Sequence, residues 1–142
     1  MDMIFLPKNF VEDLLASPAV PGKHLLESFQ HFASGKSIPF MLLEDAVPME
    51  RPDAEVHTHE GDMWYCLEGS ATFLCGGELV DGQARKNADG SVNRNEWFAK
   101  AIRGGTKYEV RAGDWLWIPH GEPHQHWSTV QARMMVIKVP KK

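Results

Sequence analysis

The apolar residues of this chain come in short runs that are separated by clusters of glycine, proline and aspartate. The runs cover residues 25–32, 39–43, 63–67, 71–75, 108–110, 115–118 and 133–139. Many short runs at this spacing, bounded by turn-forming residues, are typical of the strands of a β-sandwich or barrel. The pattern therefore predicts an all-β protein.

One segment near the start has helical spacing instead. The apolar residues within 10–15 accompany Asn9 and Glu12, which form an approximate capping pair, and Pro18 and Pro21 end the segment. We expect one short helix here.

The segment 76–105 is long for a connection between two barrel strands. Its centre, Asn87-Ala88-Asp89-Gly90, is typical of a turn between two polar arms and predicts a protruding hairpin. The hairpin is a solvated insertion without a role, a lid over the barrel mouth, or an arm that grips a second subunit. We favour the arm, because Trp97, Phe98 and Ile102 supply apolar surface that a solvated loop does not need.

Composition narrows the class of protein without changing this picture. The chain has 142 residues, 43% of them hydrophobic and 24% charged, which suits one packed domain. The net charge is −4 and the Lys and Arg residues are scattered, so we expect no nucleic-acid partner. The sequence shows neither a long apolar run nor the basic flank of an export signal, so we expect a cytoplasmic protein without membrane contact. Two cysteines, Cys66 and Cys75, make no disulfide framework and are expected to be reduced.

The segment 57–62, His-Thr-His-Glu-Gly-Asp, carries the candidate chemistry. Residues two apart on a strand point to the same face, so His57 and His59 are predicted to share one. A short reversal through Glu60 and Gly61 would bring Asp62 to meet them. Imidazole and carboxylate together suit divalent first-row metals, although an isolated His-x-His pair more often lies in an exposed polar loop.

A second segment, 113–126, favours the metal site over the exposed loop. An apolar strand enters a tight turn at Pro119 and Gly121, and His124 follows three residues after the turn glycine. The two segments together resemble the cupin family, whose motifs read G-x5-H-x-H-x3,4-E-x6-G and G-x5-P-x-G-x2-H-x3-N. The matching residues are His57, His59 and Gly69 in the first motif and Gly113, Pro119, Gly121 and His124 in the second.

The chain departs from the cupin motifs at three positions. Arg51 stands for the first glycine, Ser128 stands for the asparagine, and Asp62 stands for the glutamate, one residue closer to His59 than usual. Because its side chain is one methylene shorter than that of glutamate, Asp62 either binds the metal directly or lies beside it and holds a water. The resemblance implies a metal site formed by His57, His59, Asp62 and His124. The alternatives are ligation by the three histidines alone and a chain without a functional metal.

By the same resemblance, the fold is a cupin-type double-stranded β-helix, a jelly-roll barrel, with a short N-terminal helix. We expect residues 1–39 to form an N-terminal helix and strand arm and residues 40–142 to form the barrel, within a single domain overall. The family commonly pairs its barrels through N-terminal strands. We therefore expect a homodimer to which Phe29, Phe32 and Phe40 contribute apolar area.

Further residues are assigned to the interior by strand parity. If Asp62 points inward, Trp64 and Cys66 do so as well, and they line the substrate pocket or simply pack in the core. Ser128 is assigned to the same pocket. His126 lies two residues beyond His124, hence on the same face.

Three roles are open for His126. It is a structural histidine whose ring nitrogens have hydrogen-bond partners, a fourth imidazole ligand, or an acid/base group beside the metal. The other histidines lie outside such a pattern. His120 is expected to be exposed in the turn, and His24 and His31 are expected to be surface or strand residues.

Two classes of function fit these observations. In the first, which we favour, the protein is an enzyme that uses one divalent transition metal per chain to act on a small organic molecule. Iron is the preferred metal, with zinc, manganese, nickel and cobalt as alternatives. The cupin resemblance favours an Fe(II)-type dioxygenase for a small organic acid, phenol or diketone, in which His126 and Asp62 are catalytic. A non-redox isomerase, cyclase or lyase is the alternative chemistry. In the second class, the barrel binds or senses a small molecule without catalysis.

Overall fold

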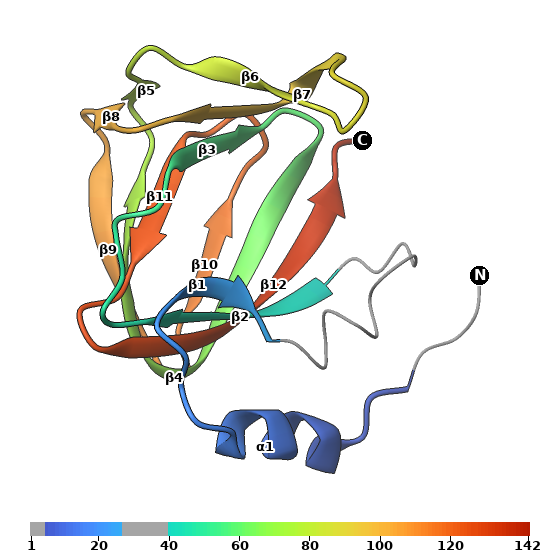
Figure 1. Cartoon of the computed structure of the whole chain (residues 1–142), viewed down its shortest axis with the longest axis vertical. Coiled ribbons are helices and arrows are strands. Elements are labelled where there is room, and N and C mark those ends of the chain that lie inside the picture. Colours follow the sequence, from blue (N-terminus) through green and yellow to red (C-terminus); the bar gives the residue numbers. More distant parts are fainter. Residues whose placement is uncertain (1–4, 27–39) are drawn as a thin grey trace.

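The structure is a computed structural model that describes residues 5–26 and 40–142. Within these ranges the chain consists almost wholly of antiparallel strands and has one short helix, as the sequence predicts (Figure 1). The elements are α1 (Lys8–Ala16), β1 (Gly22–Leu25), β2 (Phe40–Ala46), β3 (Ala54–His57), β4 (Glu60–Cys75), β5 (Glu78–Leu79), β6 (Gln83–Lys86), β7 (Val92–Ala99), β8 (Ile102–Arg103), β9 (Thr106–Arg111), β10 (Trp115–Ile118), β11 (His124–Trp127) and β12 (Gln131–Pro140).

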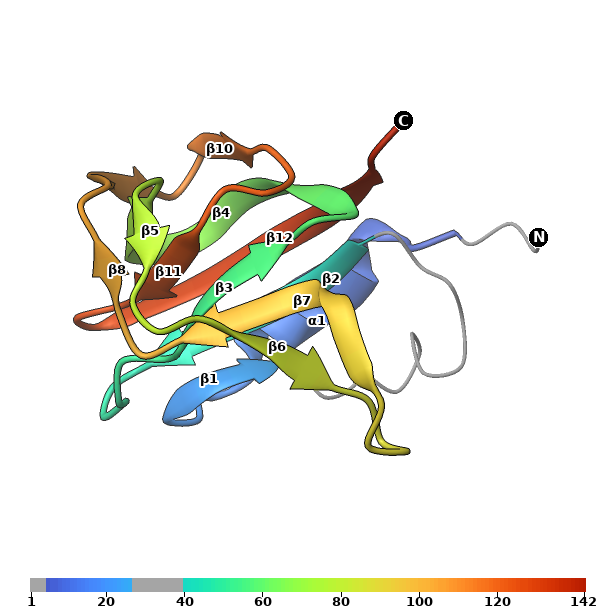
Figure 2. The same cartoon turned by 90° about the horizontal axis from the view of Figure 1, so that it is seen from above.

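The strands curl around a common interior, and α1 lies on the outside of the barrel (Figures 1 and 2). The main sheet has the order β1-β2-β12-β4-β11-β3-β7-β6, and β9 and β10 also pair with β4. The strands β5 and β8 pair separately with each other. A continuous curled sheet of this kind agrees with the predicted jelly-roll barrel.

The long strand β4 joins the two halves of the barrel. Its residues 62–65 pair with β10 and β12, whereas its residues 72–75 pair with β11 and β9. Gly69 lies between these parts with a φ of +70°, and a side chain there would collide with the backbone carbonyl of Gln131. Glycine is therefore required where β4 passes from one half to the other.

Side-chain burial along β4 alternates as the sequence predicts. Asp62, Trp64 and Cys66 are buried, whereas the residues between them are partly exposed. The buried face of β4 contributes to the core inside the barrel, which consists of Leu43, Trp64, Cys66, Ala71, Phe73, Val110, Ile118, Ala132, Met134 and Val136.

The helix α1 packs against the outer face of the barrel. Its buried Leu14 contacts Leu26 and Leu42 in a second apolar cluster. The predicted capping pair is wrong, because the helix begins directly after Pro7 and has no side-chain cap, so that Asn9 already lies in the first turn. The predicted helix itself is confirmed.

A fully buried arginine fastens the end of α1 to the barrel. Arg133 donates to the backbone oxygens of Leu14, Leu15 and Ser17 and, through Nε, to Oε1 of Glu44 at 2.7 Å. Carbonyls at a helix C-terminus have no partner within the helix and carry partial negative charge. One guanidinium therefore satisfies both the helix end and a buried carboxylate.

The segment 76–105 contains the predicted hairpin, formed by β6 and β7 around a turn at 87–91. It does not stand apart from the barrel, because β7 pairs with β3 along residues 54–57. The guanidinium of Arg85 lies 4.9 Å above the ring of Phe98, so part of the apolar surface is covered within the hairpin. A role of this segment as a dimer arm stays a prediction.

Several other predictions have separate outcomes. Both cysteines are free, and His120 is exposed, as expected. Phe29, His31 and Phe32, together with most of the predicted strand 25–32, lie outside the described residues. The homodimer, the cytoplasmic location and the division at residue 39 stay predictions.

In the ranges that the structure describes, no helix combines the length and the apolar character needed to cross a membrane.

Replacing Arg133 by methionine should strongly destabilise the fold. The variant leaves the Glu44 carboxylate buried without its guanidinium, and breaking a buried pair in this way costs about 3–5 kcal/mol. The free energy of unfolding, measured by urea denaturation, should fall by that amount. The matched control is Arg103→Met. Arg103 is exposed, and its ion pair with the exposed Glu78 is long, at 3.9 Å. A similar loss in both variants would contradict the role given to Arg133.

Candidate metal centre

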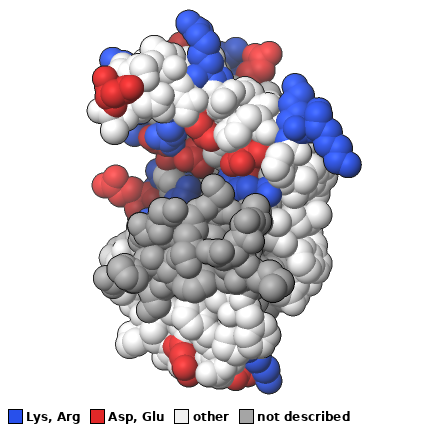
Figure 3. Space-filling model, turned by 90° about the vertical axis from the view of Figure 1, so that its right-hand side faces the viewer, with Lys and Arg blue, Asp and Glu red and all other residues white. Residues whose placement is uncertain are grey.

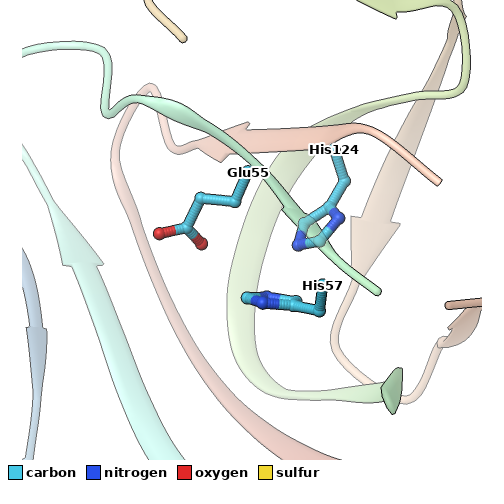
Figure 4. A group of neighbouring side chains, drawn as sticks. All are labelled: Glu55, His57 and His124. Carbon is cyan, nitrogen blue, oxygen red and sulfur yellow. The ribbon is translucent and has the colours of Figure 1, made fainter. Parts of the chain in front are cut away.

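Three strands bring the two sequence motifs together. His57 is the last residue of β3, Asp62 lies near the start of β4, and His124 is the first residue of β11. In the sheet, β11 lies between β3 and β4, with His124 opposite Glu55 on one side and Cys75 on the other. The strand order thus places the two histidines beside each other, as Figure 4 shows.

His57, Asp62 and His124 form a buried cluster. Oδ2 of Asp62 lies 3.7 Å from Nε2 of His57 and 3.5 Å from Nε2 of His124. The exposed fractions are 9% for His57, 1% for Asp62 and 3% for His124. Donor atoms that surround one tetrahedral ion at about 2.1 Å lie about 3.4 Å from one another. The two distances from Oδ2 of Asp62 are therefore close to those between ligands that share an ion.

The Asp62 carboxylate has one satisfied oxygen and one without a partner. Oδ1 accepts a hydrogen bond from Nζ of Lys138 on β12 at 2.7 Å. Oδ2 is buried and finds no hydrogen-bond partner in the described part of the chain. A buried charged oxygen in that state is strongly destabilising. A cation between Oδ2 and the two imidazoles would remove this cost.

His124 presents a lone pair to the same space. Burial lowers its pKa to about 4, and this outweighs the nearby Asp62 carboxylate, which raises the pKa. Nδ1 lies 3.1 Å from the backbone oxygen of Glu122, so Nδ1 carries the proton and donates it to that carbonyl. Nε2 is then an acceptor that faces Oδ2 of Asp62, another acceptor. The two atoms repel each other unless a cation lies between them.

His59 is a predicted ligand that lies outside the buried cluster, near the charged side chains beside it. Because β3 ends at His57 and β4 begins at Glu60, His59 lies in the connection and not on a continuous strand. The expectation of a continuous strand through both histidines is therefore wrong, although both side chains reach the carboxylate of Glu96. The His59 side chain is 41% exposed, with Nε2 3.5 Å from Oε2 of Glu60 and 3.8 Å from Oε1 of Glu96. Its ligation of the metal stays a prediction.

Glu55 lies beside the two imidazoles but is already paired (Figure 4). One of its oxygens is within 4.8 Å of ligand atoms of His57 and His124. Arg85 donates to Oε1 at 2.8 Å, and Lys23 lies 3.8 Å from Oε2. Burial raises the pKa of Glu55, but Lys23, the two histidines and Arg85 together lower it to about 2. This carboxylate is thus less available to a metal than one with a free oxygen.

His126 belongs to a second polar pair inside the barrel. Its Nδ1 lies 2.6 Å from Oδ2 of Asp45 on β2, and both residues are buried. The rings of Trp64 and Phe73 flank the imidazole, each with its centre 4.9 Å away. Oδ1 of Asp45 and Nε1 of Trp64 are buried and lack hydrogen-bond partners among the residues described. His126 therefore has a carboxylate partner that neither motif contains.

The residues predicted to line the pocket have different surroundings. Trp64 faces the interior, and Cys66 is fully buried in the core, where burial raises the pKa of its thiol. The hydroxyl of Ser128 donates to the carbonyl of Ser70 at 2.8 Å and accepts from the N–H of Val130 at 3.2 Å. These bonds fasten a turn. A role in substrate binding stays a prediction for all three pocket residues.

Three charged residues that contact predicted site residues are absent from the sequence prediction. Lys138 contacts Asp62, Glu96 contacts His57, and Asp45 contacts His126. Lys138 continues the inward side of β12 after Met134 and Val136, and a charged residue at such a position signals a partner. Asp45 gives a similar signal at the end of an apolar strand. Glu96 gives no local signal, because only the pairing of β7 with β3 brings it to the site.

Charged residues connect the buried donors to the surface. Lys138 lies 3.6 Å from Glu60, and these side chains keep 18% and 20% of their area exposed, close to the 22% of Glu96. On the face drawn in Figure 3 the surface is hollowed, and side chains of both charges gather around the hollow. The charged side chains that lie next to the buried donors, Lys138, Glu60 and Glu96, are therefore partly exposed.

No protein-family profile matches the chain. No curated protein matches it in sequence.

Solved structures do share its fold. YcfD of Escherichia coli, described as a ribosomal oxygenase, gives a TM-score of 0.52 at 16% identity over 72% of this chain and 23% of YcfD. The CENP-C cupin domain of Drosophila melanogaster gives 0.49 at 9% identity over 74% of this chain and 63% of that one. An oxalate oxidase gives 0.45 at 17% identity over 72% and 42%. This chain thus spans about a quarter of YcfD and less than two thirds of the other two.

At these identities the likeness concerns the fold and not the activity. The curled sheet and the two motifs that meet inside it agree with the same architecture. The chain has the cupin-type jelly-roll fold that its two sequence motifs predict.

Proposed function

We propose that this protein is a metal-dependent enzyme that binds one divalent first-row ion through His57, Asp62 and His124 and acts on a small organic molecule. The observation that carries the proposal is the buried Oδ2 of Asp62, which has no hydrogen-bond partner within residues 5–26 and 40–142 and lies near two imidazole Nε2 atoms. The chemistry of these donors suits an ion, and so do the two distances from Oδ2 of Asp62. A site built only for packing would have an apolar residue at position 62.

The donor set favours Fe(II). Two imidazoles and one carboxylate that leave further positions open are typical of non-haem Fe(II) oxygenases. We therefore propose an O₂-dependent oxidation, in the manner of a dioxygenase, of a small organic acid, phenol or diketone. When bound, such an ion supplies Lewis acidity and open positions for O₂ and substrate.

Two hydrogen bonds orient the donors, and two aromatic rings flank His126. Lys138 holds Oδ1 of Asp62, so that Oδ2 alone is directed at the imidazoles. The carbonyl of Glu122 holds the proton of His124 on Nδ1. Trp64 and Phe73 form an apolar wall around the imidazole of His126. The arrangement therefore fixes the donors before any ligand arrives.

Metal analysis tests the proposal. Protein purified without a metal-affinity tag and reconstituted with Fe(II) should hold about one equivalent per chain, because neutral imidazoles and a carboxylate in a dry interior bind divalent ions tightly. Asp62→Asn, His57→Ala and His124→Ala should each lose most of it. The matched control is Asp53→Asn, whose carboxylate pairs with Lys100 outside the cluster. His59→Ala decides whether His59 is a further ligand.

The reaction is tested on the same samples. The Fe(II)-loaded protein should consume O₂ in the presence of a substrate from a panel of small organic acids, phenols and diketones, and Asp62→Asn should not. Metal content below a tenth of an equivalent after reconstitution with Fe(II), Zn(II), Mn(II) and Ni(II) would contradict the metal site. Turnover of the panel without O₂ uptake would instead indicate an isomerase, cyclase or lyase.

We further propose that His126 transfers a proton during the reaction. Because Asp45 accepts the Nδ1–H of His126, the other ring nitrogen is left to exchange a proton with a substrate. His126→Ala should keep the metal and lose turnover by a factor of about 10² to 10⁴, the usual contribution of a positioned proton-transfer group. Loss of the metal would make His126 a ligand. Full activity with the metal retained would show that His126 lines the pocket without taking part in the reaction.

A further inference from the structure

Glu96 lies directly across the sheet from His57. The antiparallel pair of β3 and β7 places Val56 opposite Trp97 and His57 opposite Glu96. Beyond that pair, the N–H of Thr58 donates to the backbone oxygen of Asn95 at 2.9 Å. Glu96 is therefore held by backbone hydrogen bonds on both sides. Directly opposed residues of an antiparallel pair project their side chains to the same face.

The carboxylate of Glu96 contacts the ring nitrogen of His57 that faces away from Asp62. Oε2 of Glu96 lies 2.5 Å from Nδ1 of His57. A carboxylate oxygen can only accept, so Nδ1 carries the proton and donates it. The lone pair of Nε2 is then directed at Asp62, whose Oδ2 lies 3.7 Å away. The contact with Glu96 thus selects the form of His57 that binds a metal through Nε2.

The two histidines of the cluster are oriented by different kinds of acceptor. His124 donates to a neutral backbone carbonyl, at 3.1 Å, whereas His57 donates to a charged carboxylate, at 2.5 Å. A hydrogen bond to a charged acceptor is shorter and stronger, and a carboxylate partner makes the imidazole a more basic ligand. Of these two histidines, His57 is therefore the one whose Nδ1–H is accepted by a side chain.

Glu96 also reaches the other histidine of the His-x-His pair. Its second oxygen, Oε1, lies 3.8 Å from Nε2 of His59, and the Glu96 side chain is 22% exposed. A ligand oxygen of Glu96 lies within 4.8 Å of ligand atoms of His57 and Glu60. Glu96 therefore brings the 76–105 segment into contact with both histidines of the first motif, His57 and His59.

We propose that Glu96 is a positioning residue of the metal centre, and that the 76–105 segment serves the centre by delivering it on β7. The inference rests on the metal site proposed above. It gives this segment a role beside that of a dimer arm or a lid. Loss of Glu96 should leave the barrel intact, because the β3–β7 ladder is formed by backbone atoms.

The test compares Glu96→Ala and Glu96→Gln with the control Glu78→Ala. Glu78 lies in the same segment and is 80% exposed, and the ion pair that it forms within the described residues is with Arg103, at 3.9 Å. The Zn(II) dissociation constant is measured by competition with a chelator. Glu96→Ala should bind Zn(II) about 10- to 100-fold more weakly, which is the usual effect of removing a residue that orients a ligand. Glu96→Gln, which keeps an acceptor oxygen, should restore part of the affinity, and Glu78→Ala should match the unmodified protein.

A second measurement does not depend on metal. Two-bond ¹H–¹⁵N correlation spectra of the metal-free protein should show His57 with its proton on Nδ1, and Glu96→Ala should abolish that preference. The inference is overturned if the variant keeps both the tautomer and the affinity. It is also overturned if Glu96→Ala loses the metal as completely as His57→Ala, because Glu96 would then be a ligand. If the unmodified protein binds no metal, the proposed function fails by itself, and the spectra still decide whether Glu96 orients His57.

Discussion

The buried carboxylate of Asp62 is the group around which the interior is arranged. It is held from one side by Lys138 at 2.7 Å and faces His57 and His124 at 3.7 and 3.5 Å on the other. The lysine compensates the charge, but it occupies only Oδ1. An oxygen that is buried, charged and without a partner is tolerated in a folded protein when function requires it. The strength of the metal proposal comes from this oxygen, because no group of the described residues donates a hydrogen bond to it.

The course of β4 explains how residues more than sixty positions apart meet. The strand passes through both halves of the barrel and turns at Gly69, so its first half carries Asp62 and its second half pairs with the strand that carries His124. The antiparallel register then fixes which side chains face inward. A shift by one residue would turn Asp62 to the outside. The centre therefore depends on the backbone pairing of β4 more than on the local conformation of either motif.

The same dependence explains what could be predicted from the sequence. Strand alternation gave the inward positions of Asp62, Trp64 and Cys66, and the two motifs gave the fold. Alternation could not place His59, because it holds only within a strand and β3 ends two residues earlier. Lys138, Asp45 and Glu96 could not be assigned to partners, since each meets its histidine or aspartate through a pairing that no sequence spacing encodes. Asn9 failed as a cap because Pro7 precedes the helix start.

Charged residues on the two faces of the sheet formed by β2 and β12 also specify the register of β12. Glu44 and Arg133 are direct neighbours across the two strands and face α1, whereas Asp45 and Lys138 point to the interior. If β12 slipped by one residue, Arg133 would enter the barrel and Lys138 would leave Asp62 without its cation. Each error buries an unpaired charge, which costs more than a misplaced apolar side chain. Buried ion pairs often add little net stability, so their value here is that they penalise the alternative register. The network that fastens α1 outside the barrel and the network that holds the Asp62 carboxylate inside it therefore enforce the same strand pairing.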